Sequence, residues 1–206
     1  MRRWGALLLC MALCASSAWA QTDTLVGVRK GSIELGGAGG LSIPVGDYGD
    51  WASLSGTGAV ILGYYPSPRL SFGVDWGGHW HGPTDQADSL KAIELGQSDA
   101  ELGFKLYRIL TPYIKYQFKV AKVSPYATGI MGLYLQEVKW TEQTIGGTVS
   151  QSVAQGYLGV GAGLGVQWVT DDNVEIFLEG RFHNAMRDGA MPIQFIDARV
   201  GLAFLL

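Results

Sequence analysis

Apolar and polar residues alternate one by one along most of the chain. The clearest stretch runs from Arg69 to His81, where Leu70, Phe72 and every second residue after them are apolar or glycine. Successive side chains of a β-strand point to opposite faces, so a period of two indicates strands. The pattern therefore predicts an all-β protein, and we expect its strands to form an eight-stranded antiparallel up-and-down barrel.

Seven other stretches share this period. They cover residues 32–43, 57–65, 99–120, 126–140, 154–168, 174–183 and 196–206. The stretch 99–120 keeps one apolar phase over about twice the 9–11 residues that a membrane strand needs. Pro112 favours a break there, which either turns a hairpin or marks a periplasmic extension. We predict eight strands, because ten would require a further strand that the pattern does not supply.

Short and long connections alternate between the predicted strands. Pro66-Ser67-Pro68 and Asp171-Asp172-Asn173 are tight turns, whereas longer polar segments cover 46–55, 82–90, 141–150 and 184–192. Outer-membrane barrels have short turns on the periplasmic side and longer loops outside. This order predicts that both termini lie in the periplasm.

The first twenty residues have the composition of an export signal. Arg2 and Arg3 precede a short apolar run from Ala6 to Leu13, and Ala18 and Ala20 flank Trp19 in a small-x-small cleavage pattern. We expect a signal peptide over residues 1–20 and an outer-membrane barrel domain over 21–206. The apolar run is too short to span a bilayer as a helix.

Composition narrows the possible chemistry. Both cysteines lie in the predicted leader, which excludes disulfides and thiolate sites from the mature chain. Without Arg2 and Arg3, 13 basic residues face 18 acidic ones, a balance that disfavours nucleic acid as a partner. Only 16% of residues are charged and 30 are glycine, which suits a barrel whose strands show one face to lipid.

Alternation alone leaves a soluble, lipocalin-like barrel as the alternative to a membrane barrel. The scarcity of Lys and Glu for an exposed polar face favours the membrane arrangement, as do aromatic residues near strand ends (Tyr64, Trp76, Trp80 and Trp168). The charged residues would then line the lumen and pair with one another. The predicted lumen charge network comprises Glu34, Asp75, Glu175, Glu179, Arg181, Asp197 and Arg199, and we extend it to Glu101 and Lys105.

Two other patterns invite functional interpretations. Gly159, Gly161, Gly163 and Gly165 lie on one strand face and are expected to make room for large lumen side chains, since no helix follows to bind a phosphate. His79 and His81 share a face, and His183 is expected at the same end of the lumen. With the predicted third and seventh strands far apart and no obvious carboxylate partner, we interpret the histidines as polar lumen or rim residues. We predict no metal site and no cofactor.

The last strand carries a resemblance to a known signal. Residues 199–206 resemble the C-terminal β-signal through which the outer-membrane assembly machinery recognises barrels, with Arg199, Gly201, Phe204 and Leu206 at the matching positions. More broadly, residues 29–206 resemble the OmpA/OmpX-like outer-membrane β-barrel family, in Ser124-Pro125-Tyr126 and in 174–182 after Asp171-Asp172-Asn173. The resemblance implies a place in the outer membrane, contact with its lipid and lipopolysaccharide, and the assembly machinery as a partner during insertion.

An enzymatic alternative is a lipid A deacylase, a family of exported barrels with a His-x-Ser-Asn segment. The nearest stretch here is 181–185, where His183 and Asn184 are adjacent and the serine is absent, so no activated hydroxyl is available. We therefore predict no catalytic residues. The function we expect is non-enzymatic, a structural or surface-interaction role through extracellular loops around a side-chain-filled lumen; a small porin-like channel is the other alternative.

Overall fold

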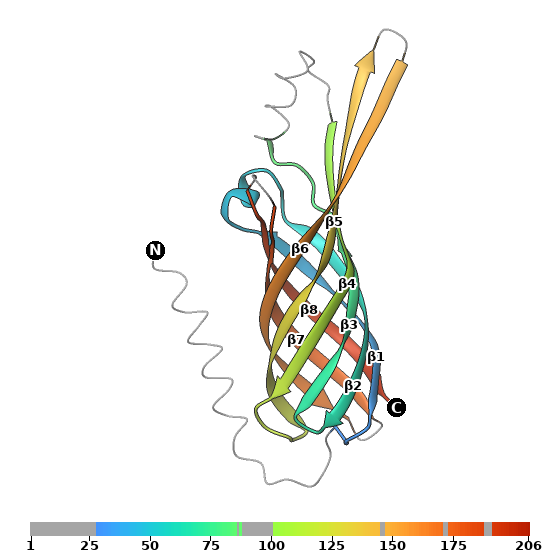
Figure 1. The fold of residues 1–206 in the computed structure, drawn as a ribbon, viewed down its shortest axis with the longest axis vertical. Coiled ribbons are helices and arrows are strands. Elements are labelled where there is room, and N and C mark those ends of the chain that lie inside the picture. Colours follow the sequence, from blue (N-terminus) through green and yellow to red (C-terminus); the bar gives the residue numbers. More distant parts are fainter. Residues whose placement is uncertain (1–27, 86, 88–100, 145–146, 171–172, 188–190) are drawn as a thin grey trace.

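The chain forms one closed antiparallel barrel of eight strands, each hydrogen-bonded to its neighbours in the sequence (Figure 1). The computed structural model describes residues 28–85, 87, 101–144, 147–170, 173–187 and 191–206. The elements are β1 (Ile33–Pro44), η2 (Gly46–Asp50), β2 (Ser55–Ser67), β3 (Leu70–His79), β4 (Glu101–Gln117), β5 (Val123–Thr144), β6 (Gly147–Val169), β7 (Val174–Ala185) and β8 (Ile193–Leu205). The predicted fold class and strand number are confirmed.

The last strand closes the ring by pairing with the first. β8 lies antiparallel to β1 from Leu205, opposite Glu34, to Phe195, opposite Pro44. We call the end that holds Leu206 and the connections after β2, β4 and β6 the turn end, and the opposite end the loop end. The predicted leader, with Ala18 and Ala20, lies outside the described residues.

The long alternating stretch around Pro112 is a single strand. β4 continues from Glu101 to Gln117, so Pro112 neither turns a hairpin nor ends the strand. Proline lacks an N–H, and β4 pairs with β5 at Leu110 and Tyr113, on either side of it. Pro112 itself faces outward, opposite Val74 of β3.

A β-bulge overturns the single apolar phase predicted for this strand. The β4–β5 register shifts between Arg108 and Leu110. Leu106 is therefore 0% exposed inside the lumen, whereas Leu110, at the same parity, is 51% exposed on the outer face. An extra residue in one strand moves all later side chains to the other face. The prediction that Lys105 lines the lumen is consequently wrong, because its neighbour Leu106 occupies the inner face.

The outer face of the barrel is apolar. The aromatic residues predicted near strand ends (Tyr64, Trp76, Trp80 and Trp168) all point outward, with Trp76 63% exposed. Leucine, valine and isoleucine cover the face between them, for example Leu164 and Leu178. Such a face would be unfavourable in water and suits hydrocarbon, so the inverted arrangement holds in place of the lipocalin-like one. Among the described residues, no helix is long and apolar enough to cross a bilayer.

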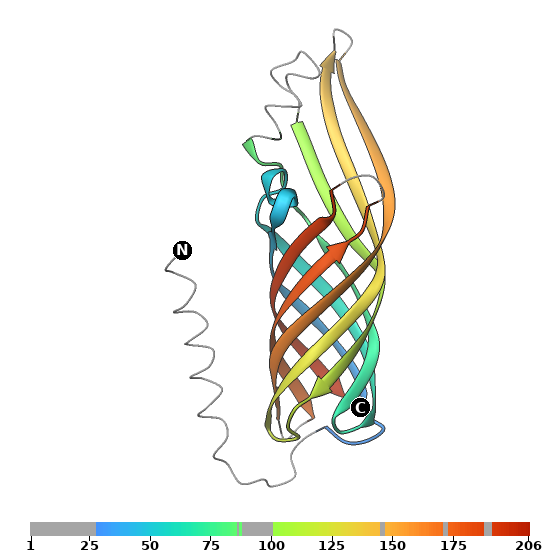
Figure 2. The same ribbon diagram turned by 60° about the vertical axis from the view of Figure 1, so that its left-hand side comes forward.

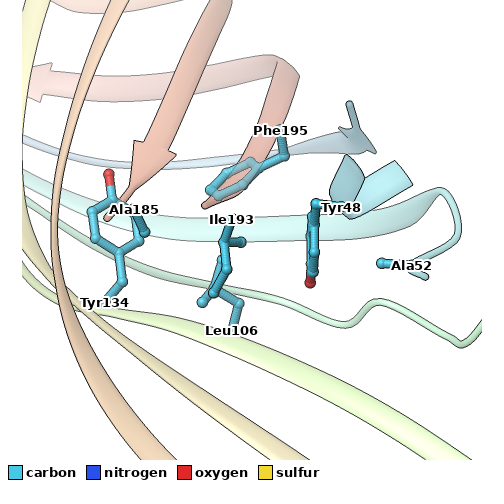
Figure 3. Packing of buried hydrophobic residues seen from close by; sticks show 7 residues of the cluster. All are labelled: Tyr48, Ala52, Leu106, Tyr134, Ala185, Ile193 and Phe195. Carbon is cyan, nitrogen blue, oxygen red and sulfur yellow. The ribbon is translucent and has the colours of Figure 1, made fainter. Parts of the chain in front are cut away.

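A cluster of buried side chains fills the lumen at the loop end (Figure 3). Tyr48 reaches inward from η2 and lies near Phe195 and Ile193 of β8 and Leu106 of β4. The cluster, which we call the loop-end cluster, comprises Tyr48, Ala52, Leu106, Tyr134, Ala185, Ile193 and Phe195. Apolar packing therefore occupies the lumen at this level.

Two strands rise well above the others at the loop end (Figures 1 and 2). β5 and β6 remain paired as far as Thr144 and Gly147, whereas β7 accompanies β6 only as far as Gly159. The prediction of a polar loop over 141–150 is therefore wrong, because these residues extend the two strands. The connecting residues 145–146 lie outside the described part of the chain.

The glycines of β6 make room for large lumen side chains, as predicted. A Cβ atom on Gly165 would lie 2.4 Å from the Tyr126 ring, and one on Gly163 would lie 2.6 Å from Cγ of Arg181. A Cβ on Gly159 would similarly lie 2.6 Å from the Tyr134 ring. Glycine is therefore required at these three positions of β6, because side chains from other strands occupy the space that a Cβ atom would need.

We expect Gly165→Val to reduce the folded fraction strongly. Its side chain would overlap the Tyr126 ring inside a closed wall that cannot expand, and overpacking of this kind costs about 1–3 kcal/mol or more. The measurement is the heat-modifiable shift of the refolded barrel on a gel. Gly180→Val is the matched control, since an added Cβ there meets nothing nearer than 4.0 Å. Equal folding of both variants would contradict this explanation.

Candidate functional site in the barrel lumen

All seven residues of the predicted lumen charge network lie inside the barrel. Asp75 of β3 is 0% exposed, and the other six are at most 3% exposed. Burial without partners would cost several kcal/mol per charge. The structure meets this cost by arranging the charges in three layers along the lumen.

The central layer joins two arginines to two carboxylates. Asp75 Oδ2 accepts hydrogen bonds from Arg181 Nη1 at 2.8 Å and from Arg199 Nη1 at 2.6 Å. Glu179 Oε2 accepts from Arg199 Nε at 3.0 Å and Nη2 at 2.9 Å, while its Oε1 lies 2.7 Å from Arg181 Nε. The four side chains come from β3, β7 and β8, so the layer ties strands from opposite sides of the ring.

The layer near the turn end is centred on a lysine that the sequence analysis missed. Lys115 Nζ of β4 donates to Glu34 Oε1 at 3.2 Å and to Glu175 Oε1 at 2.9 Å. Tyr113 and Tyr65 donate their hydroxyls to the same two carboxylates, at 3.2 and 3.1 Å. The sequence signal for Lys115 was the alternation itself, because it lies between Ile114 and Tyr116 of the apolar face and therefore on the inner face.

The layer near the loop end brings the histidines together around an aspartate. Asp197 Oδ1 lies 3.4 Å from His79 Nδ1, and its Oδ2 lies 3.4 Å from His183 Nε2. The rings of His79 and His183 are 6.2 Å apart. β3 and β7 do lie far apart around the ring, as predicted, but His79 and His183 still meet across the narrow lumen. The prediction that the histidines have no carboxylate partner is wrong.

The histidine layer is packed by aromatic rings. Phe195 stacks on His183 with centroids 4.6 Å apart, and the Tyr134 hydroxyl lies 2.9 Å from His183 Nδ1. Among the residues that the structure describes, no group of three or more His, Cys, Asp or Glu side chains is arranged to hold a metal ion. His79, His183 and Asp197 form a polar network that the rings of Phe195 and Tyr134 pack against.

One serine–histidine pair has the connectivity of a nucleophile and base. Ser42 Oγ lies 3.5 Å from His81 Nε2, and His81 Nδ1 lies 3.0 Å from the carbonyl oxygen of Ser53. Both side chains are buried in the lumen, as is His183. An acyl chain on the outer, lipid-facing surface would not reach these buried side chains, and the His81 contact ties the loop residue Ser53 to the inner wall.

A small internal cavity lies between the central and turn-end layers. Its volume is about 10 Å³, enough for one water molecule. The cavity is lined by Glu34, Ile61, Tyr113, Lys115, Tyr126, Phe177, Glu179, Arg181 and Arg199. These side chains occupy the rest of the cross-section at this level.

The four residues of the predicted β-signal have separate structural positions. Arg199 belongs to the central layer, and Gly201 leaves space for the Phe177 ring, which would lie 2.0 Å from an added Cβ. Phe204 and Leu206 point outward near the turn end. Recognition by the assembly machinery remains a prediction.

We expect Asp75→Asn to destabilise the barrel by about 3–5 kcal/mol, the usual cost of removing one partner from a buried ionic network. Arg181 and Arg199 would then share Glu179 as their carboxylate. Urea unfolding in lipid vesicles, followed by tryptophan fluorescence, measures the change. Asp47→Asn, at an exposed aspartate of η2, is the control and should alter stability by less than about 0.5 kcal/mol. Equal effects would contradict the network's role.

Acid should lower the stability of the folded barrel through His81. Burial lowers the pKa of the His81 imidazole below its ordinary value, although the Ser53 carbonyl and Asp197 act in the opposite direction. The unfolded chain therefore takes up this proton at a higher pH than the folded chain does. Stability attributable to His81 is full above about pH 6.5 and falls as the pH drops below it.

The test compares urea midpoints of the wild type and His81→Gln between pH 8 and pH 5. The variant should lose less stability on acidification, because one group with a depressed pKa has been removed. A variant with the full wild-type pH dependence would contradict the assignment. Asp50→Asn, at an exposed loop-end aspartate, serves as the control for mutation near the barrel mouth.

Solved structures support the fold at low sequence identity. Neisserial surface protein A, from Neisseria, is 17% identical with a TM-score of 0.60, and the match covers 84% of this chain and 96% of that one. The N-terminal barrel domain of OprF from Pseudomonas aeruginosa is 13% identical with a TM-score of 0.53, covering 86% and 98%. The attachment invasion locus protein Ail of Yersinia pestis is 15% identical with a TM-score of 0.51, covering 86% and 100%.

No curated protein matches the chain significantly. A family model does, however, over nearly the whole sequence. The model described as the outer membrane protein beta-barrel domain matches residues 6–204. With the closed ring of eight strands, the apolar outer face and the charged lumen, this match shows that the chain belongs to the outer membrane protein β-barrel domain family and is an outer-membrane protein.

Proposed function

We propose that this protein is a non-enzymatic surface-interaction barrel, which binds extracellular partners through its loop end and carries no continuous pore. The observation that carries the proposal is the rise of β5 and β6 above the barrel, where no described strand pairs with one edge of β6. The side chains that fill the lumen support the lack of a continuous pore.

The open edge of β6 begins where β7 ends. Met186 N donates to Leu158 O at 2.8 Å, and Gly159 is the last β6 residue in register with β7. Beyond it, no described strand pairs with this side of β6 as far as Gly147. An exposed strand edge presents N–H and C=O groups to which another extended chain can add.

The composition of this edge favours strand addition. Residues 149–156 are exposed on both faces and contain valine, serine, glutamine and alanine without a charge or a proline. Natural edge strands are commonly protected by charge or proline, and both are missing from this segment. We infer that β6 accepts an extended segment of a partner protein.

The filled lumen argues against a porin-like channel. Eight strands enclose a space just wide enough for side chains. Here the three charged layers and the loop-end cluster occupy it, and the cavity between two layers has room for one water molecule. Ion conduction would require several buried salt bridges to open together.

The orientation that we propose places both termini and the turn end in the periplasm. The long hairpin and η2 then face outward, where lipopolysaccharide and extracellular partners lie. Insertion would use the outer-membrane assembly machinery, with Arg199, Gly201, Phe204 and Leu206 as its recognition residues. Ser152→Cys should react with an impermeant maleimide on intact cells and Arg69→Cys only after permeabilisation; the reverse pattern would contradict this orientation.

In planar bilayers we expect the refolded barrel to show no stable, large conductance steps. The physical reason is the paired charge network, whose opening would expose unpaired charges to a narrow lumen. A porin reconstituted in the same way provides the positive control. Stable, large steps from the pure protein would overturn the filled-lumen proposal in favour of a small channel.

Strand addition predicts a specific effect of proline on β6. Backbone groups alternate in direction along a strand, and Leu158 O points toward the β7 side, so Ser152 directs its N–H toward the open edge. Ser152→Pro removes that donor without breaking the β5–β6 ladder. In a binding assay of the labelled barrel on arrayed extended peptides, this variant should lose most of the signal.

The matched control is Ser152→Ala, which keeps the N–H and should bind as the wild type does. Equal binding by all three proteins, or its absence from the wild type, would count against strand addition. Release of fatty acid from lipid A by the purified barrel, abolished by His183→Ala, would instead indicate a hydrolase.

A further inference from the structure

We propose that the turn end of the barrel carries a binding surface for the headgroups of anionic phospholipids. The surface combines a row of exposed basic residues with outward aromatic pairs directly beside it. It rests on the proposed function only in placing the turn end at the phospholipid leaflet that faces the periplasm.

At the turn end, basic residues lie on the outer rim and carboxylates point into the lumen. The exposed or partly exposed basic residues of this end are Arg29, Lys30, Arg69, Lys119 and Lys122. The carboxylates Glu34 and Glu175, by contrast, point into the lumen, where Lys115 neutralises them. Asp171 and Asp172, in the connection after β6, lie outside the described residues. The outer rim along β1 to β5 is therefore basic.

Backbone hydrogen bonds place these basic residues along one continuous part of the rim. Gly31 N donates to Tyr65 O at 2.7 Å, which holds the segment with Arg29 and Lys30 against the end of β2. Gln117 N donates to Arg69 O at 2.8 Å, which places Arg69 beside the end of β4 and close in sequence to Lys119. The row thus follows consecutive strands.

Aromatic side chains lie next to this row on the lipid-facing surface. Tyr64 of β2 meets Phe72 of β3 edge to face at 5.7 Å, and Tyr116 meets Phe118 at 5.9 Å. Leu70, which follows Arg69, is in register with Tyr116. All four rings are exposed, and aromatic rings at such positions lie at the boundary between hydrocarbon and headgroups.

The aromatic pairs therefore fix the depth of the basic residues in the bilayer. Arg69 and Lys119 lie just beyond the rings, at the level of the lipid phosphates. Guanidinium and ammonium groups there would form charge-assisted hydrogen bonds with phosphate oxygens. A headgroup with a net negative charge, such as phosphatidylglycerol, gains this attraction fully, whereas the choline of phosphatidylcholine offsets it. The partner is accordingly an anionic phospholipid.

The test uses spin-labelled lipids and the whole barrel refolded in phosphatidylcholine vesicles. The measured quantity is the association of spin-labelled phosphatidylglycerol relative to phosphatidylcholine. Wild-type protein should prefer phosphatidylglycerol. Arg69→Gln/Lys119→Gln should reduce the preference by at least about twofold, because a basic residue at an anionic surface is worth up to roughly fivefold in association. About 0.5 M NaCl should have a similar effect.

Lys105→Gln/Lys139→Gln is the matched control, since it removes two positive charges from the loop-end parts of β4 and β5. A preference that falls equally in both double variants would overturn the proposal, as would its absence from the wild type. Co-sedimentation of the wild type with purified peptidoglycan, lost in Arg69→Gln/Lys119→Gln without any lipid preference, would assign the row to the cell wall instead.

The gel shift of the folded barrel verifies that every variant is folded. Because the vesicles have the same lipid in both leaflets, the result does not depend on orientation, conductance or strand addition. Failure of the lipid proposal and failure of the proposed function are therefore distinguishable.

Discussion

Backbone hydrogen bonding within hydrocarbon is the constraint on which the rest of this structure depends. Every N–H and C=O at that depth needs a partner, and only a closed ring of strands provides one on both sides of each strand. Here β8 completes the ring against β1 along eleven register pairs. Closure with eight strands then fixes a narrow interior, which the chain must fill with its own side chains.

The way in which that interior is filled explains much of the unusual composition. Charged side chains are few, and those inside pair across strands: Glu179 with Arg199, and Lys115 with Glu34 and Glu175. The glycines of β6 allow Tyr126, Tyr134 and Arg181 to cross the lumen. The apolar residues face outward, so the protein has a polar interior and an apolar exterior, as its solvent requires.

In the function that we propose, the barrel acts on its surroundings at its two ends. At the loop end, β5 and β6 continue past β7, no described strand pairs with the far edge of β6, and Tyr48 of η2 packs in the loop-end cluster. At the turn end, inward carboxylates leave the outer rim basic beside Tyr116 and Phe118. The two proposals thus assign protein recognition to one end and lipid recognition to the other.

Period-two alternation determined by itself that the chain makes strands, how many there are, and which charged residues share an inner face, because side chains along a strand alternate strictly. The tertiary structure alone decided three features. The bulge between Arg108 and Leu110 turned Lys105 out of the lumen and left Lys115, at the same parity, inside it, since one extra residue reverses the facing between the two parts of a strand. His79 and His183 met at Asp197 because a narrow ring brings distant strands together across its axis. Residues 141–144 and 147–150 extended β5 and β6, since pairing between these strands outweighed their polar, loop-like composition.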